Sequence, residues 1–172
     1  MNLYILLIFL LTSLCYGTTD LQSEHLINAV LQSNITLSLS LIRSIRQRYD
    51  KMKLLDTTNI AGLSALHIAA TKGFDDVVRL LIMSGADMNL QTTVERQTAL
   101  HLSSWNAMKT VVETLVKFGV QTNVLDYMNN TALDLARKKR YVDIIDLLEV
   151  VTIETCSAST SAVDIINTGA TM

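Results

Sequence analysis

The 172-residue chain contains no proline, two cysteines and few aromatic residues. The absence of proline excludes collagen-like segments and proline-rich linkers, and it removes the residue that most often interrupts helices. An aromatic content of 5% disfavours an all-β sandwich, because strands are enriched in Tyr, Phe and Trp. Two cysteines are too few for a disulfide framework. Together these absences favour a helix-rich architecture.

The chain also lacks a strong charge of either sign. A formal net charge of −2 indicates neither a nucleic acid nor an anionic membrane surface as partner. Apolar residues, in contrast, are abundant: they make up 49% of the chain and raise the mean hydropathy to +0.33. Part of this excess lies within the first fifteen or so residues, which therefore need a separate explanation.

Residues 3–14 read LYILLIFLLTSL and carry no charge. A run of about 12 residues is shorter than the roughly 20 that span a bilayer, and it is typical of a signal peptide. Cys15 and Gly17 place small side chains three and one residues before Thr18, so we predict a signal peptide over 1–17. No Lys or Arg precedes the run, which leaves an uncleaved anchor or an interfacial helix as alternatives.

Cleavage before Thr18 predicts a secreted, extracellular protein without a membrane span; retention in the secretory pathway or membrane anchoring is the alternative. Two N-x-[ST] sequons, at Asn34 and Asn129, are then candidate glycosylation sites. Cys156 would be the remaining cysteine, either as a passive thiol or as a link between chains. We expect a monomer.

Three segments of the chain repeat one pattern. They begin at Ser64, Thr98 and Thr131, at offsets of 34 and then 33 residues. Apolar side chains coincide at five positions of the repeat: Leu66, Leu100 and Leu133; Ile68, Leu102 and Leu135; Val77, Val111 and Ile144; Val78, Val112 and Ile145; and Leu81, Leu115 and Leu148. Such periodicity indicates stacked units that share one apolar core.

Each unit reads as two short helices. Ser or Thr at its first position is a good N-cap for the first helix, and Gly73 can end that helix in the left-handed conformation. Asp75 then opens a second helix, in which Val77, Val78 and neighbouring apolar residues form one stripe. The residues after Gly85 would form an extended turn to the next unit.

These units resemble ankyrin repeats. The first helices open with SALHIAA at 64–70, TALHLSS at 98–104 and TALDLAR at 131–137, and GADMN at 85–89 matches GVQTN at 119–123. The resemblance implies an all-α solenoid of about three clear helix-turn-helix repeats. This chain departs from the family in two ways: Ala replaces the family's proline, and Ala107 and Arg140 stand where glycine is expected, so those turns should be strained or reshaped.

The resemblance also divides the chain. We assign a signal peptide at 1–17, an atypical N-terminal helical cap at 18–58, ankyrin repeats at 59–92, 93–125 and 126–151, and a polar flexible tail at 152–172. Within the cap, Leu26 lies 40 residues before Leu66, so about seven residues are inserted relative to the repeat. We expect an overlong second helix from Thr36 to Leu55, with basic residues at its outer end.

Catalytic chemistry is not indicated. His67 and His101 occupy the signature position, at which the resemblance implies a structural brace, with Asp134 in the equivalent place. Stacked repeats would separate the two histidines by about 10 Å, too far to share one zinc ion. Glycine-rich phosphate loops and metalloprotease or hydrolase motifs are absent from the sequence. We expect neither an enzyme nor a cofactor or metal.

One basic run, Arg137-Lys138-Lys139-Arg140, falls inside the third repeat. Three readings remain open: an ordinary helix and turn, a contact surface, or a processing site in a secretory chain.

The resemblance implies that another protein binds through the turn tips and the concave face of the first helices. Trp105, the single tryptophan, falls at the centre of that surface, and packing against the next repeat is the alternative role for it. We predict a protein-binding site, apolar at its centre with basic residues on one side: Ile60, Leu63, Lys72, Val94, Gln97, Trp105, Asn106, Tyr127, Met128, Lys138 and Lys139. The alternative function is a membrane-anchored or intracellular ankyrin-type scaffold or inhibitor.

Overall fold

The computed structural model describes residues 20–47 and 54–151. The expected signal peptide, the polar tail and Cys156 lie outside these residues. Helices run in pairs along the chain: α2 (Asp20–Leu31) and α3 (Ile35–Arg46), α5 (Ala65–Lys72) and α6 (Asp75–Ser84), α7 (Ala99–Trp105) and α8 (Lys109–Lys117), then α9 (Ala132–Lys139) and a last helix over 142–151.

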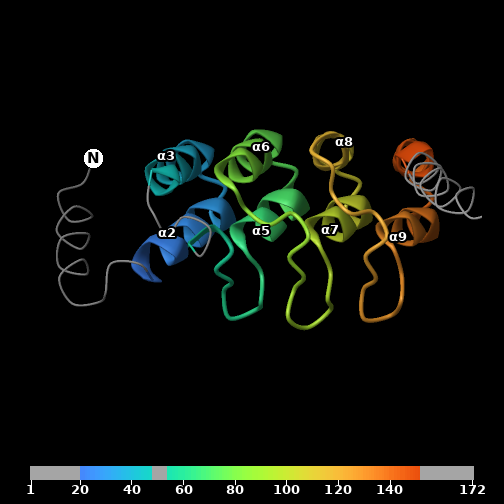
Figure 1. Ribbon diagram of the computed structural model, residues 1–172, viewed down its shortest axis with the longest axis horizontal. Coiled ribbons are helices and arrows are strands. Elements are labelled where there is room, and N and C mark those ends of the chain that lie inside the picture. Colours follow the sequence, from blue (N-terminus) through green and yellow to red (C-terminus); the bar gives the residue numbers. More distant parts are fainter. Residues whose placement is uncertain (1–19, 48–53, 152–172) are drawn as a thin grey trace, which may run out of the picture.

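The helices form two rows (Figure 1). The first helices of successive pairs lie side by side, α2 against α5, α5 against α7, and α7 against α9. The second helices pack in the same order, α3 against α6 and α6 against α8. Loops between the pairs project from the stack on the side of the first helices (Figure 1). The predicted all-α ankyrin solenoid is thereby confirmed.

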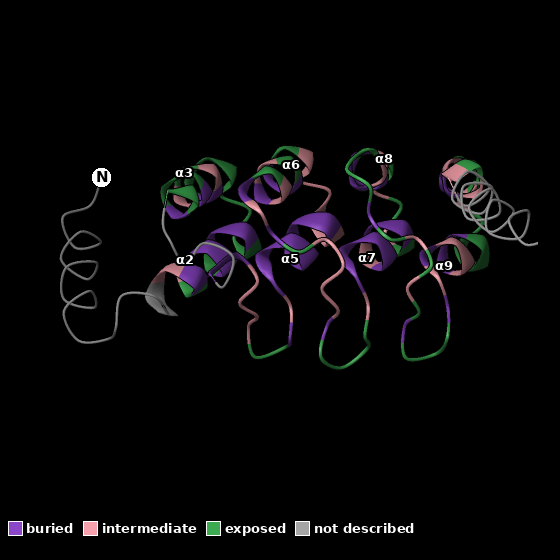
Figure 2. Cartoon of the chain, viewed as in Figure 1, coloured by how far each residue is buried: buried purple, intermediate pink, exposed green. Residues whose placement is uncertain are grey.

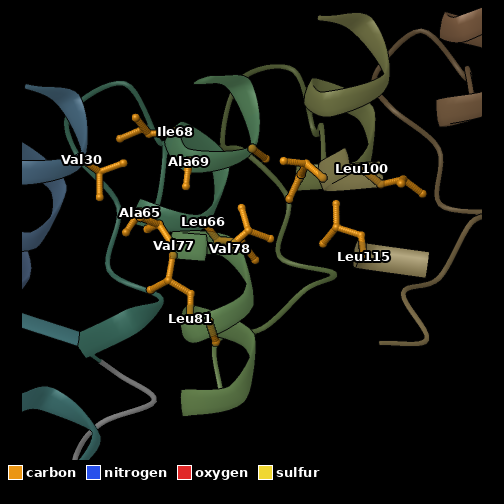
Figure 3. Packing of buried hydrophobic residues seen from close by; sticks show 14 of the residues in the cluster. Val30, Ala65, Leu66, Ile68, Ala69, Val77, Val78, Leu81, Leu100 and Leu115 are labelled. Carbon is orange, nitrogen blue, oxygen red and sulfur yellow. The ribbon is translucent and has the colours of Figure 1, made fainter. Parts of the chain in front are cut away.

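A continuous apolar core runs between the two rows (Figures 2 and 3). Leu66 and Leu100 are 2% and 1% exposed, and the equivalent Leu133 is partly buried against the same cluster. The second helices contribute their apolar stripes, which are fully buried at the equivalent positions Val77, Val78 and Leu81; Val111, Val112 and Leu115; and Ile144 and Leu148. Burial at matching positions is what lets each short hairpin fold, since an isolated hairpin cannot bury its own apolar face.

Capping boxes start the first helices of all three repeats. Ser64, Thr98 and Thr131 are the N-cap residues, and the third helical residue returns a side-chain bond to the cap. His67 Nδ1 accepts from the Ser64 backbone N–H at 3.1 Å, so the proton lies on Nε2, which donates to the Leu90 carbonyl at 2.9 Å. These two hydrogen bonds to the backbone make His67 a brace between the helix and the following turn, and His101 forms the equivalent pair.

A left-handed residue joins the two helices of every pair. Its φ is 58° at Ser33, 76° at Gly73, 59° at Ala107 and 61° at Arg140. The turns without glycine therefore keep the repeat's geometry and accept the strain of a side chain at positive φ. Ser33 and Gly73 are 40 residues apart, so the first pair follows the same plan as the others with its insertion placed later.

The N-terminal cap differs from the expectation in one respect. A single helix from Thr36 to Leu55 is wrong, because α3 ends at Arg46 with Gln47 as its C-cap. Ile45 is the last buried residue of α3, and Leu54 and Leu55 are buried where the described residues resume.

Within residues 20–47 and 54–151, every helix is too short or too polar to cross a bilayer.

Candidate protein-binding groove

Three turn tips extend from the stack, and each is closed by a hydrogen bond between backbone groups. Asn59 N donates to Leu63 O at 3.0 Å, Thr92 N to Gln97 O at 2.8 Å, and Asp126 N to Asn130 O at 3.0 Å. The middle tip thus contains one more residue than the other two.

The first residue of each tip also orders the tip through its side chain. Asn59 Oδ1 accepts from the backbone N–H groups of Ala61 and Leu63, each at 3.0 Å. Asp126 Oδ1 accepts from Met128 N at 2.9 Å and Asn130 N at 2.8 Å. These hydrogen bonds outweigh the effect of burial and lower the pKa of Asp126, which therefore stays ionised inside the tip. In the second tip, Thr92 Oγ1 accepts a single hydrogen bond of this kind, from Gln97 N at 3.0 Å.

Adjacent tips are tied together. Tyr127 N donates to Glu95 O at 3.0 Å, and Gln91 Nε2 donates to both Leu125 O and Arg96 O. Between the first two tips the approach is closer still: a Cβ on Gly62, whose φ is 72°, would lie 1.9 Å from Thr93 Oγ1. Gly62 is thus required both by its conformation and by the neighbouring chain. The three tips form one ordered wall.

Two adjoining hollows lie between this wall and the first helices. The larger, of about 430 Å³, spans the second and third tips and is lined by Glu95, Gln97, Leu102, Trp105, Asp126, Tyr127, Met128, Asn130, Leu135 and Lys138. The smaller, of about 320 Å³, spans the first and second tips and is lined by Ala61, Leu63, Thr71, Thr92, Val94, Glu95, Gln97 and Leu102. Since Glu95, Gln97 and Leu102 belong to both hollows, we call the pair the tip groove.

Trp105 lines the larger hollow of the tip groove. Its side chain is 42% exposed, so it lines the surface and is not buried against the next repeat. Lys139 Nζ lies 3.8 Å from the centroid of the Trp105 ring, which is cation–π geometry. Lys138 Nζ donates to Asn130 Oδ1 at 2.6 Å, so the two lysines stand at the end of the groove formed by α9 and the third tip.

The structure brings together most of the predicted partner-binding residues. Leu63, Val94, Gln97, Trp105, Tyr127, Met128 and Lys138 line the tip groove, and Lys139 covers one face of the Trp105 ring.

Three of the predicted residues lie elsewhere. Ile60 projects from the apex of the first tip, fully exposed, outside both hollows. Lys72 extends toward the N-terminal cap, where its Nζ donates to Leu31 O and to Ser33 Oγ at 3.0 Å. Asn106 caps the end of α7, and its Nδ2 donates to Leu102 O at 2.7 Å.

Sequence reasoning missed Leu102, Leu135, Thr92 and Asp126 as groove residues. Leu102 and Leu135 were expected in the apolar spine, because they align with Ile68, which is buried in the core. Asp126 and Thr92 align with Asn59, an alignment that shows only when one extra residue is allowed in the second tip. Side-chain acceptors at these three aligned positions were the available signal.

The basic run belongs to α9 and its C-cap, with Arg140 at positive φ. Arg137 is paired with Glu149 at 2.8 Å and lies 3.9 Å from Asp134. Lys138 lines the tip groove and Lys139 lies over the Trp105 ring, so the basic run contributes to two different surfaces.

Both predicted glycosylation positions are exposed. Asn34 is the N-cap of α3, accepting from Leu37 N at 3.1 Å, and Asn129 is the left-handed residue of the third tip.

The residues that the structure describes contain no group of three or more His, Cys, Asp or Glu side chains placed to hold a metal ion. His67 and His101 use both ring nitrogens on the protein itself.

Comparison with known proteins places the repeats in a family. The family profile described as "Ankyrin repeats (3 copies)" matches residues 66–154, just over half of the chain. The chain is similar to the B-cell lymphoma 3 protein homolog of Mus musculus, with 26% identity over 137 residues that cover 79% of this chain and 30% of that protein. It is also similar to protein phosphatase 1 regulatory subunit 12A of Rattus norvegicus, with 25% identity over 143 residues, or 76% of this chain and 13% of that protein.

A third relative is an ankyrin repeat protein of fowlpox virus (strain NVSL), 32% identical over 90 residues that cover 50% of this chain and 18% of that protein. The chain thus spans less than a third of the length of each of these relatives. Matched repeats, capping boxes and stacked hairpin pairs agree, and the chain belongs to the ankyrin-repeat family.

Proposed function

We propose that this chain is a secreted protein that binds another protein in the tip groove and catalyses no reaction. The observation that carries the binding proposal is the exposed Trp105 ring in the larger hollow of the tip groove, beside the ordered tips.

The groove offers the features of a protein-binding surface. Large apolar side chains remain exposed there, including Trp105, Tyr127 at 57%, Met128 at 61% and Val94 at 76%. Exposed aromatic and methionine side chains are enriched at interfaces, where they act as anchors. The backbone bonds that tie the tips together reduce the ordering cost of binding.

The relatives support the same class of function. One of them is by its name a regulatory subunit of a phosphatase, that is, a protein that acts together with another protein. None of the relatives named above is described as an enzyme by its own name.

A photo-cross-linking experiment tests the binding site. We would place p-benzoylphenylalanine at Val94, inside the tip groove, and separately at Met83, which is 54% exposed on α6 of the opposite row. Binding in the groove predicts a discrete adduct from Val94, formed with proteins of the extracellular fluid, and none from Met83. Equal adducts from both positions, or adducts from Met83 alone, would contradict the proposed site.

Support for secretion comes from the apolar run over residues 3–14 and from the two exposed sequons. Amino-terminal sequencing of protein from the culture medium tests it. Secretion after cleavage predicts Thr18 as the first residue. Retention of Met1 in a membrane or cell fraction would instead support the anchored or intracellular scaffold or inhibitor.

A further inference from the structure

We propose that the tip groove takes an extended segment of a partner protein in which carboxylates adjoin a group of apolar side chains, with the carboxylates beside Lys138 and Lys139. The inference rests on the proposed binding function and adds to it the chemistry of the bound segment and the place of its acidic part.

At the basic end of the groove, Lys138 lies near enough to Asp134 to help lower the pKa of that carboxyl, after the larger effect of the Thr131 hydrogen bonds, without forming an ion pair with it. Within residues 20–47 and 54–151, Arg137 is paired with Glu149, whereas Lys138 and Lys139 form no ion pair. Lys138 uses one N–H on the Asn130 amide oxygen, and an ammonium has three. Both lysines can therefore donate to a carboxylate of a bound segment.

The acidic groups of the groove indicate where in it a carboxylate of the bound segment would lie. Asp126 is 2% exposed and its oxygens are occupied by Asn130 and Met128, so it is not presented to a ligand. Glu95 is exposed and lies where the two hollows meet. A carboxylate near Glu95 would be repelled, whereas one beside Lys138 and Lys139 would be attracted.

Apolar surface connects these two regions. Leu63, Val94 and Leu102 line the smaller hollow, and Trp105, Tyr127 and Met128 line the larger one. Because Lys139 lies on the Trp105 ring, a side chain that covers Trp105 also brings its neighbours to Lys139. A partner that buries the Trp105 ring would partly desolvate the pair formed by Lys139 and the carboxylate of the bound segment. Desolvation strengthens the attraction between these two charges.

The test uses a random dodecapeptide library displayed on phage, with the purified full-length chain as target. The account predicts that selected peptides carry a group of apolar residues with Asp or Glu at one end of it. In fluorescence anisotropy, the double variant Lys138→Glu/Lys139→Glu should bind these peptides about tenfold or more weakly. Peptides with Lys in place of the acidic residues should recover binding to this variant.

The matched control is Arg43→Glu/Lys117→Glu, which changes the net charge equally at exposed positions on α3 and α8. Affinity should be unchanged in this control. Selection of basic peptides, equal loss in both double variants, or unchanged affinity in Lys138→Glu/Lys139→Glu would overturn the inference.

Failure of the proposed function gives a different result. If peptide binding depends on Trp105 but not on the two lysines, the groove binds and only the charge assignment is wrong. If no selected peptide is affected by Trp105→Ala, the groove itself is not the site. Cross-links from Val94 to residues 152–172 of the same molecule, or to a second copy of the chain, would also overturn the external partner.

Discussion

His67 and His101 act as uncharged braces at the residue scale. Each imidazole accepts from a backbone N–H through Nδ1 and donates to a carbonyl through Nε2, which only the neutral ring can do. Burial holds the pKa of both rings below the ordinary 6.5. In the third repeat Asp134 takes this place, and the hydrogen bonds from Thr131 lower its pKa.

These pKa shifts predict an acid-sensitive stability. The unfolded chain binds protons at the two histidines below about pH 6.5 and the native chain does not, so the free energy of unfolding should fall as the pH drops below that value. Asp134 should contribute only when the pH falls to its ordinary pKa of 3.8 and below.

Urea unfolding between pH 7.5 and pH 5 measures this dependence. A His67→Gln/His101→Gln variant should be less stable at pH 7.5 but show a flatter pH profile. His25 is retained in both proteins, so the difference between them reports only on the two braces. Identical profiles would show that the braces are not the source of the acid sensitivity.

Ala107 carries strain that a glycine would remove. Its φ of 59° is left-handed, as in the other helix–helix turns, and a side chain there costs roughly 1–2 kcal/mol. Glycine adds about 0.5–1 kcal/mol of unfolded-state entropy, so Ala107→Gly should stabilise the chain by about 0.5–1 kcal/mol in urea unfolding. Ala136→Gly, at a buried position inside α9, should destabilise it. A loss of stability in Ala107→Gly would contradict this assignment.

Local chemistry at this scale could be read from the sequence. Ser64, Thr98 and Thr131 were predictable as caps because the cap bond joins residues three apart. The Lys139–Trp105 contact could not be predicted, because it joins neighbouring repeats through a side-chain conformation. The position of the Lys72 side chain could not be predicted either, because it extends to the N-terminal cap and away from the groove.

At the scale of elements, the turn tips are the parts that the structure explains best. The third tip depends on Asp126, whose carboxylate accepts from Met128 N and Asn130 N and so fixes the side chains between them. The first tip uses Asn59 in the same way, so an amide can replace the carboxylate.

Asp126→Ala should loosen the third tip, whereas Asp126→Asn should preserve it. Loss of the acceptor leaves two backbone N–H groups without a partner, at a cost of about 1–3 kcal/mol for each if it is buried. Hydrogen exchange measured by NMR should therefore be faster at Met128 and Asn130 in the alanine variant and nearly unchanged in the asparagine variant. Equal exchange in both variants would argue that backbone bonds alone order the tip.

Element boundaries were less predictable than element types. The helix pairs followed from apolar spacing, but α3 ends at Arg46 and not at Leu55, as the apolar residues at both ends had suggested. Leu54 and Leu55 are buried in the core although they lie outside α3, so apolar character alone did not show where α3 ends.

At the scale of the whole molecule, a 33–34-residue period produces one continuous object. Equivalent leucines at 66, 100 and 133 join a single core, and equivalent tips form a single wall. The period made the stack predictable, because each pair can bury its apolar face only against the next. The depth and lining of the tip groove were not predictable, since they depend on how closely adjacent tips approach, as at Gly62 and Thr93.

The central claim is that this stack of repeats binds another protein in the tip groove, with Trp105 as a main contact. The direct measurement is the affinity, by isothermal titration calorimetry, of the partner captured at Val94 for the original chain, for Trp105→Ala and for Met83→Ala. The account predicts that Trp105→Ala loses about 2 kcal/mol or more, roughly 30-fold, with its helical circular dichroism unchanged, while Met83→Ala binds normally. Normal binding by a folded Trp105→Ala variant would contradict the account.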